Sequence, residues 1–318
     1  MRYLLLLLLF SCSITLYSQE KEFTKLNDSL YLVQKQPQKG FHWEYLLYIP
    51  KNTNRNKPQF LLVEPNNTGF TSDTIDVHKQ HAISLASKNS IGNNIASMLK
   101  IPLLVPIFSR PSSSPLLYTH ALDRDVILNT SPELERLDNQ LLAMITDAKS
   151  ILSTLDITIK PKIFMNGFSA SATFTNRFSF LHPEKIAALA IGGFNGALML
   201  PQKSIDHKVL TYPLGLNDFE LLFNKPFHIA AYKKIPQFIY MGALDTNDAV
   251  QFDDAYSPQE RQLINTYLAA TVNPRFKKCR SIYEKHFNHI QFKEYENVGH
   301  WTTSAINMEI ITFFFHQL

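Results

Sequence analysis

Residues 162–171 read Lys-Ile-Phe-Met-Asn-Gly-Phe-Ser-Ala-Ser, and this stretch decides the fold. An apolar, β-rich run leads directly into Gly-Phe-Ser-Ala-Ser and then into a helical pattern. A serine on such a sharp strand-to-helix turn is exposed above the sheet, and small residues two positions before and after it allow the turn to close. Gly167 and Ser171 are those residues, with serine replacing the usual second glycine. Ser169 is therefore a candidate nucleophile, and the alternative is that it only caps the following helix.

Short apolar segments alternate with longer helical patterns on both sides of this turn. The alternation is typical of a parallel sheet covered by helices on both faces. Several of the segments are almost entirely apolar, as expected for strands buried on both faces. The expected strands are 45–49, 60–64, 103–108, 162–166, 187–191, 237–241 and 290–296, and the expected helices are 78–99, 132–155, 171–181, 257–270 and 302–316.

Two stretches do not follow this alternation. Residues 194–234 have little regular pattern, and insertions of this length are usually lids or substrate-binding loops. Residues 109–130 follow a strand, so they should lie on the ligand side of the sheet. This second stretch carries a group of ionisable residues, namely His120, Asp123, Arg124 and Asp125. We interpret them as a salt-bridged structural loop, with direct substrate contact as the alternative.

The N-terminus has the pattern of a secretory signal peptide. Met1-Arg2 is followed by an apolar run at 3–10 and then by small and polar residues. That run is too short to span a bilayer, and no later stretch is apolar for long enough to do so. We expect a signal peptide at 1–18, a single domain at 19–318, and export to the periplasm or the cell exterior. Cys12 leaves attachment through a lipid anchor as an alternative.

Composition excludes several classes of function. The formal net charge of +4 is spread along the chain, and the basic cluster at 275–280 fits a solvated helix face. We expect no nucleic-acid partner, because no basic stripe is interleaved with aromatic residues. Only Cys279 remains after signal removal, so no internal disulfide is possible. We expect no metal and no cofactor, because no paired cysteines, His-Glu-x-x-His helix or clustered ligands are visible.

The position of His300 predicts a general base. With a nucleophile on this type of turn, the catalytic residues follow the chain order serine, acid, histidine. Among the eleven histidines, His300 follows Gly299 where the last expected strand gives way to a loop. Its imidazole can reach Ser169 there and take the serine proton, provided that a carboxylate holds its other ring nitrogen. A helix-capping or surface histidine is the alternative interpretation.

The acid should follow the strand at 237–241. Two carboxylates come after Gly242 in the run Ala-Leu-Asp-Thr-Asn-Asp. We choose Asp245, which lies three residues after the glycine. Asp248 is the alternative acid, or a residue that braces the loop.

A tetrahedral oxyanion needs donors that already point at it. The N–H of Ala170, directly after the serine, is the first predicted donor. The second is assigned to the Asn67 backbone in the Pro-Asn-Asn-Thr-Gly run that follows an early strand, with Asn66 as the next choice. That run can also be read as a simple turn. The predicted walls of the substrate pocket are Asn66, Phe168, Trp301 and the excursion at 194–234.

Together these residues resemble the α/β-hydrolase superfamily, and within it secreted esterases, polyhydroxyalkanoate-depolymerase-like proteins and dienelactone-hydrolase-like proteins. The resemblance extends from about Tyr45 to the end and rests on 167–171, 242–245 and Gly299-His300. It implies an α/β-hydrolase fold with a mostly parallel central sheet, helices on both faces and a long loop excursion after the sixth strand of that fold. The run at 65–68 is similar to the oxyanion loop of polyester-cleaving members, which favours Asn67.

The resemblance implies a reaction type but not a polymer substrate. Ser171 stands where most members have glycine, and the disulfides of many secreted polyesterases cannot form here. We expect a serine hydrolase that cleaves carboxylic esters, small or polymeric, through an acyl-enzyme: Ser169 attacks, His300 shuttles the proton and Asp245 orients His300. A peptidase or amidase with the same triad, and a non-catalytic binding protein on this fold, are the alternatives. Neither acyl chain length nor oligomeric state follows from these residues.

Overall fold

The computed structural model describes residues 23–87 and 90–318. The expected signal peptide at 1–18 and Cys12 lie outside these ranges. Within the ranges, no helix combines the length and the apolar character needed to cross a bilayer.

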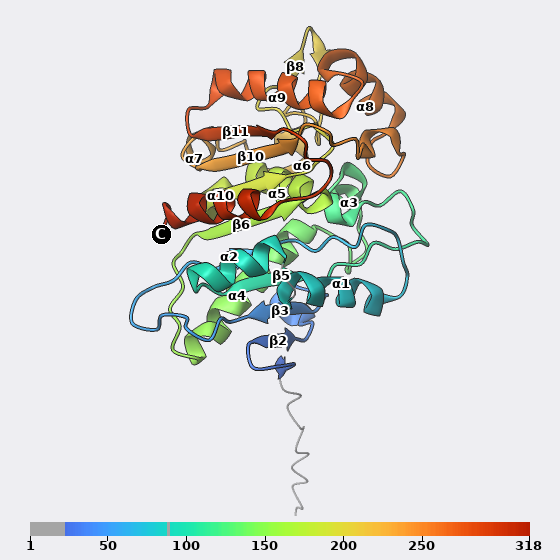
Figure 1. Ribbon diagram of the computed structural model, residues 1–318. Helices are drawn as coiled ribbons and strands as arrows, with labels where there is room; N and C mark the ends of the chain where they lie inside the picture. The colour runs from blue at the N-terminus through green and yellow to red at the C-terminus, as the bar shows by residue number, and fades with distance from the viewer. Residues whose placement is uncertain (1–22, 88–89) are drawn as a thin grey trace, which may run out of the picture.

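A nine-stranded sheet forms the centre of the structure (Figure 1). Its six strands from β5 to β11 pair in parallel, whereas β1, β2 and β3 pair antiparallel along one side. The strands, in spatial order, are β1 (Phe23–Lys25), β2 (Leu30–Val33), β3 (Tyr45–Tyr48), β5 (Leu103–Pro106), β4 (Leu62–Val63), β6 (Ile163–Phe168), β7 (Ile186–Gly192), β10 (Gln237–Gly242) and β11 (Ile290–Tyr295). The predicted mostly parallel sheet is confirmed, and the seven expected strands all form.

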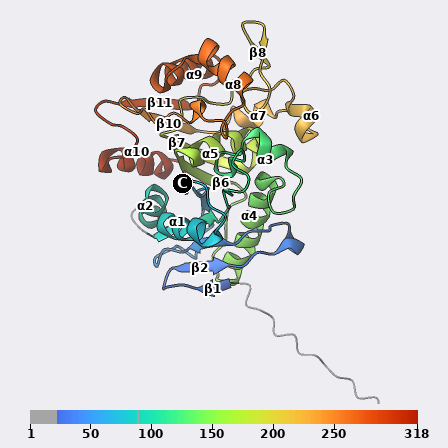
Figure 2. The same ribbon diagram turned by 90° about the vertical axis from the view of Figure 1, so that its right-hand side faces the viewer.

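Helices cover both faces of this sheet, as Figure 2 shows for α1, α2 and α10 on one side and α4 and α5 on the other. Successive strand residues point to opposite faces, so Leu62 joins the apolar cluster beneath α2 and α10, while Val63 joins the cluster beneath α4 and α5. The long helices are α1 (Ile75–Ser87), α2 (Ile91–Leu99), α4 (Leu137–Thr154), α5 (Ala170–Leu181), α9 (Val272–His286) and α10 (Ser304–Phe315). The shorter ones are η1 (Pro37–Lys39), η2 (Thr119–Ala121), α3 (Arg124–Leu128), η3 (Pro183–Lys185), α6 (Phe219–Phe223), α7 (Ile229–Tyr232), η4 (Ala249–Gln251), α8 (Pro258–Leu263) and η5 (Ile264–Leu268).

Some boundaries differ from the prediction. The single helix expected at 78–99 is two helices, because the Ser90 side chain caps α2 by accepting a hydrogen bond from the Asn93 N–H at 3.1 Å. The helix expected at 132–155 begins at Leu137, since Arg136 has a left-handed φ of 46°. β1 and β2 were not expected, and α9 was expected only as a solvated helix face at 275–280.

The excursion at 194–234 lies between β7 and β10 and is packed into the molecule. It forms a hairpin of β8 (Ser204–Ile205) and β9 (Lys208–Val209), followed by α6 and α7. Its apolar residues Leu200, Tyr212 and Leu214 are buried in the same cluster as the α4 and α5 face of the sheet. Apolar packing of this kind fixes the excursion as part of the core rather than leaving it as a free loop.

Candidate active site

The turn between β6 and α5 holds Ser169 in a strained backbone conformation. Its φ is 63° and its ψ is −128°, a combination that costs a residue other than glycine on the order of 1–3 kcal/mol. The turn closes tightly at Gly167, where an added Cβ would lie 2.4 Å from the Ser171 carbonyl oxygen. The Ser171 hydroxyl donates to the Phe168 carbonyl at 2.8 Å and accepts from the Phe168 N–H at 2.9 Å. The Ser171 hydroxyl thus holds the turn together, and the half-buried Ser169 hydroxyl is left to contact His300.

The structure brings together the three side chains predicted as nucleophile, base and acid. His300 Nε2 lies 3.1 Å from Ser169 Oγ, and His300 Nδ1 lies 3.0 and 3.3 Å from the two carboxylate oxygens of Asp245. An ionised carboxylate can only accept, so Nδ1 carries the proton and Nε2 is free to accept from the serine. The Asp245 side chain is fully buried, while that of His300 is 28% exposed. The Asp245 carboxylate also accepts a hydrogen bond from the Asn247 N–H at 2.9 Å.

Sheet geometry explains how residues so far apart in sequence meet. β10 and β11 are adjacent and parallel, with Gly242 opposite Tyr295, so the loops after them leave from the same edge. The Leu244 N–H donates to the Val298 carbonyl at 2.8 Å, which connects the turn after β10 (residues 242–245, the acid turn) to the loop after β11 (residues 296–300, the histidine loop). A Cβ at Gly242 would lie 2.3 Å from the Val298 oxygen, so this approach requires glycine. The serine turn, the acid turn and the histidine loop all lie at the carboxyl ends of parallel strands.

Asp248, the alternative acid, is paired elsewhere. Its two carboxylate oxygens accept from the Arg275 guanidinium at 2.8 and 3.2 Å, and one of them also accepts from the Val250 N–H. The Arg275 side chain is fully buried on α9, so it does not belong to the solvated helix face expected at 275–280. Asp248 therefore braces the loop and balances a buried cation.

The loop after β4 (residues 64–69, the β4 loop) lies beside the serine turn, because β4 and β6 are adjacent parallel strands. The Asn67 N–H forms no hydrogen bond within the described part of the chain. Ala170 begins α5, where helix N–H groups have no partner inside the helix. The Ala170 and Asn67 N–H groups, which were predicted as the oxyanion donors, therefore have no hydrogen-bond partner within the described residues.

Asn66 has a structural role in this loop and was wrongly expected to line the pocket. Its side chain is fully buried. The amide nitrogen donates to the Phe108 carbonyl at 2.8 Å, and the amide oxygen accepts from the Phe108 N–H at 3.1 Å. Both ends of the carboxamide are occupied, so Asn66 anchors the β4 loop to the end of β5.

His120 anchors the same loop from the 109–130 stretch. Its Nδ1 accepts from the Thr68 N–H at 3.4 Å and its Nε2–H donates to the Phe108 carbonyl at 2.9 Å. Burial lowers the pKa of His120 to about 3, so this imidazole stays neutral. Two other ionisable residues of the stretch are also structural: Asp123 caps α3, and Arg124 pairs with Asp218 at 2.7 Å, whereas Asp125 is exposed in the first turn of α3.

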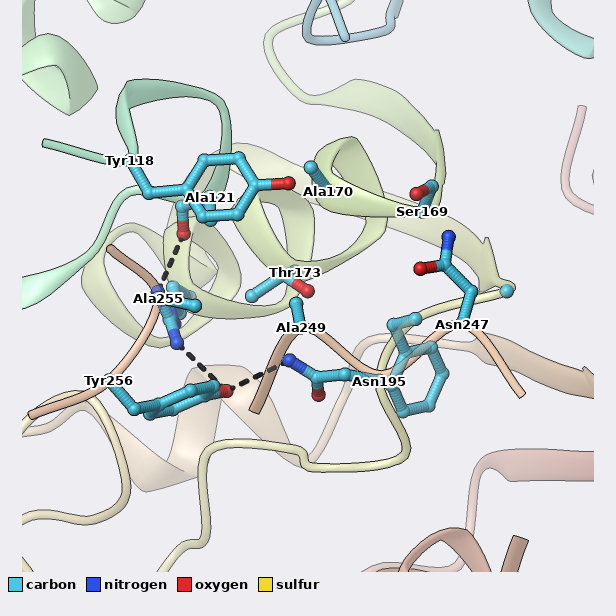
Figure 3. A pocket seen from close by; sticks show the side chains of 13 residues that line it. Tyr118, Ala121, Ser169, Ala170, Thr173, Asn195, Asn247, Ala249, Ala255 and Tyr256 are labelled. Carbon is cyan, nitrogen blue, oxygen red and sulfur yellow. Dashed lines mark hydrogen bonds between the residues drawn. The ribbon is translucent and has the colours of Figure 1, made fainter. Parts of the chain in front are cut away.

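A small pocket of about 40 Å³ opens beside Ser169 (Figure 3). Of the excursion at 194–234, Phe194 and Asn195 line it. Two predicted wall residues do not: Phe168 packs against the His300 ring at 5.0 Å, and Trp301 is 55% exposed. The lining residues are Tyr118, Ala121, Ser169, Ala170, Thr173, Arg177, Gly193, Phe194, Asn195, Asn247, Ala249, Ala255 and Tyr256.

Sequence reasoning missed most of the polar side chains in this pocket. They come from three separate segments: the loop before η2, the buried side of α5, and the loops around η4. One signal was present, since Thr173 and Arg177 follow Ser169 at intervals of four residues, which places them on one side of the expected helix. No group of three or more His, Cys, Asp or Glu side chains in the described residues could hold a metal ion.

Comparisons with known proteins identify the fold. No protein-family model and no curated protein sequence matches this chain. Poly(aspartic acid) hydrolase-1 from Sphingomonas sp. KT-1 superimposes with a TM-score of 0.55 at 17% identity, over 85% of this chain and 92% of that protein. Poly(3-hydroxybutyrate) depolymerase from Bordetella parapertussis superimposes with a TM-score of 0.55 at 12% identity, over 91% of this chain and 89% of that protein.

A third similar structure is S-formylglutathione hydrolase from Agrobacterium tumefaciens. It has a TM-score of 0.54 at 11% identity, over 93% of this chain and 98% of that protein. These likenesses span nearly the whole length of each partner. The chain therefore has the α/β-hydrolase fold, as the resemblance in its motifs implied.

Proposed function

We propose that this chain is a serine hydrolase that cleaves carboxylic ester bonds through an acyl-enzyme intermediate. The observation that carries the proposal is the hydrogen-bonded series Ser169–His300–Asp245, which ends in a serine on a strained turn. Backbone strain of this kind persists where the surrounding structure enforces it, and it is concentrated at functional sites. The hydrolases among the similar folds agree with this reaction type.

In the proposed acylation step, His300 Nε2 takes the Ser169 proton as Oγ attacks the ester carbonyl. The N–H groups of Ala170 and Asn67 stabilise the negative charge on the carbonyl oxygen. His300 then gives its proton to the leaving alcohol. Asp245 keeps the ring orientation and stabilises the imidazolium, and a water molecule later repeats the sequence to release the acid.

The test is the initial rate of hydrolysis of p-nitrophenyl esters of graded chain length by residues 19–318. Ser169→Ala should lower kcat by at least roughly 10⁴-fold, because it removes the nucleophile. Ser153→Ala, at an exposed position on α4, is the matched control and should retain the wild-type rate. A fluorophosphonate probe should label Ser169, located by mass spectrometry of the digested protein.

Two outcomes would redirect the assignment. Ser169-dependent cleavage of peptide or amide substrates, without ester turnover, would make the chain an amidase; one similar structure is a hydrolase of poly(aspartic acid), so that polymer belongs in the substrate panel. No turnover together with no labelling of Ser169 would favour the binding protein.

We also propose that residues 19–318 form one exported domain. The support is the signal-peptide pattern at the N-terminus. Mass spectrometry of the protein from the periplasm or medium should give a mature N-terminus near residue 19. A lipid-modified N-terminal Cys12 would instead establish anchoring.

A further inference from the structure

Arg177 places a buried cation in the pocket beside Ser169. Its side chain extends from α5, and the residue is 3% exposed. One guanidinium nitrogen donates to the Ala121 carbonyl at 2.9 Å and another to the Tyr256 hydroxyl at 3.1 Å. These partners are neutral. Within the described residues no carboxylate lies within ion-pair distance of Arg177.

The other two buried arginines of the described chain are paired. Arg110 forms an ion pair with Asp254, and Arg275 forms one with Asp248. A buried charge is costly unless an opposite charge and hydrogen bonds compensate it. Arg177 is therefore the exception, and it is the one of the three that lines the pocket.

Two buried carboxyl groups on which the Arg177 guanidinium acts electrostatically are engaged in helix caps. Asp123 accepts from the Val126 N–H at 3.0 Å, and Glu260 accepts from the Ser257 N–H at 2.8 Å. Burial raises the pKa of Asp123 to about 7 and also raises the pKa of Glu260, in spite of the opposing effect of the guanidinium. Neither group makes the direct contact that would neutralise Arg177.

Helix geometry sets the distance between this cation and the nucleophile. Arg177 follows Ser169 by eight residues, so their Cα atoms are about 12 Å apart along the axis of α5. Side chains on a helix lean toward its N-terminus, which brings the guanidinium closer to the serine. Thr173 lines the pocket between them. A short substrate chain attached at Ser169 can therefore extend along α5 toward Arg177.

The pocket lies on the acyl side of the scissile bond. His300 must protonate the leaving oxygen, so the leaving alcohol occupies the His300 side. The pocket lining includes Ala170, whose N–H is a proposed oxyanion donor, and does not include His300 or Trp301. Its small volume and polar walls do not suit a long apolar acyl chain.

We infer that this pocket binds a short acyl group that ends in a carboxylate, which pairs with Arg177. The preferred substrates are then half-esters of short dicarboxylic acids, or esters with an equivalent acidic acyl group. An arginine and a carboxylate match in both charge and geometry, and the remaining N–H groups of Arg177 can donate to such a partner. This inference rests on the proposed serine hydrolase function.

The test compares p-nitrophenyl monoesters of succinic, glutaric and adipic acid with p-nitrophenyl butyrate, valerate and hexanoate. For wild type, kcat/KM for the best charged ester should be roughly 10- to 100-fold higher than kcat/KM for the neutral ester of equal length. Arg177→Gln should lower the ratio of these two values to one or below, and Arg177→Lys should restore part of it. Arg124→Gln removes a neighbouring positive charge that does not line the pocket, and it should retain the ratio.

A second measurement does not depend on whether the Arg177 variants fold. Glutarate should inhibit wild-type hydrolysis of p-nitrophenyl acetate competitively, at a concentration at least roughly 10-fold lower than butyrate does. Turnover of neutral esters with no preference for charged ones, and equal inhibition by the two acids, would overturn the inference while supporting the serine hydrolase. Absence of any turnover and of labelling at Ser169 would overturn the proposed function itself.

Discussion

Replacing Ser169, the proposed nucleophile, by glycine should stabilise the protein relative to replacing it by alanine. Ser169 has a φ of 63° and a ψ of −128°, and a conformation of this kind costs a residue with a Cβ on the order of 1–3 kcal/mol. Glycine adopts it freely but loses about 0.5–1 kcal/mol through the greater entropy of the unfolded chain. Relative to Ser169→Ala, the net gain is about 0–2.5 kcal/mol, which corresponds to at most about 4 °C in Tm for a chain of this size.

Ser169→Ala is the matched control for this prediction. Both variants lack the hydroxyl and therefore lose the 3.1 Å hydrogen bond to His300, but only alanine keeps the Cβ and the strain. Differential scanning calorimetry, with urea titration as a second measure, should rank Ser169→Gly above Ser169→Ala, and both should be inactive. Equal stabilities would refute the idea that strain is stored at the nucleophile.

Three further predictions concern the surrounding residues. Asp245→Asn should lower kcat/KM by roughly 10³- to 10⁴-fold in the p-nitrophenyl assay, because it removes the partner that orients the imidazole. Asp248→Asn should instead lower the free energy of unfolding by about 3–5 kcal/mol in urea titrations, because it leaves buried Arg275 unpaired. The reverse pattern would make Asp248 the acid. Burial raises the pKa of Glu64 from 4.5 to about 7 in the folded protein. The unfolded chain therefore loses this proton at a lower pH than the folded protein, and the free energy of unfolding of wild type falls as the pH rises from about 4.5 to about 7. Glu64→Gln should therefore gain about 3 kcal/mol at about pH 8 and little at about pH 4, and a gain independent of pH in urea titrations would contradict this cause. Asn66→Ala should lower kcat by roughly 10- to 100-fold with KM nearly unchanged, since the β4 loop loses its anchor on Phe108; a wild-type kcat would show that the loop needs no such anchor.

The parts of the site that the sequence predicts are those with local causes. The turn at Ser169 depends on a strand, a glycine and a helix that follow one another directly in the chain. His300 depends on the end of a strand and one glycine. The choice between Asp245 and Asp248 could not be made locally, because it depends on the contact of Asp248 with Arg275. Arg275 follows Asp248 by 27 residues, on a helix face that was expected to be solvated rather than buried.

The pocket depends on tertiary packing and was predicted less well. Asn66 and His120 meet only because β4 and β5 lie side by side, and nothing in either segment indicates the other. Arg177 was visible as one position on an expected helix, but its lack of a carboxylate partner appears only when Tyr256 and Ala121 surround it. Because these side chains come from segments far apart in the sequence, no residue spacing within one segment predicts the pocket.

The two hydrogen bonds of the Ser171 hydroxyl have a consequence for how chains with the α/β-hydrolase fold are recognised from their sequences. A search pattern that requires Gly-x-Ser-x-Gly rejects this chain at its fifth position, although the turn that the glycine normally permits is fully formed. The turn brings Gly167 against the backbone of residue 171, and the serine side chain there adds two hydrogen bonds to Phe168. A pattern that also admits serine there would recover divergent hydrolases that the glycine rule discards.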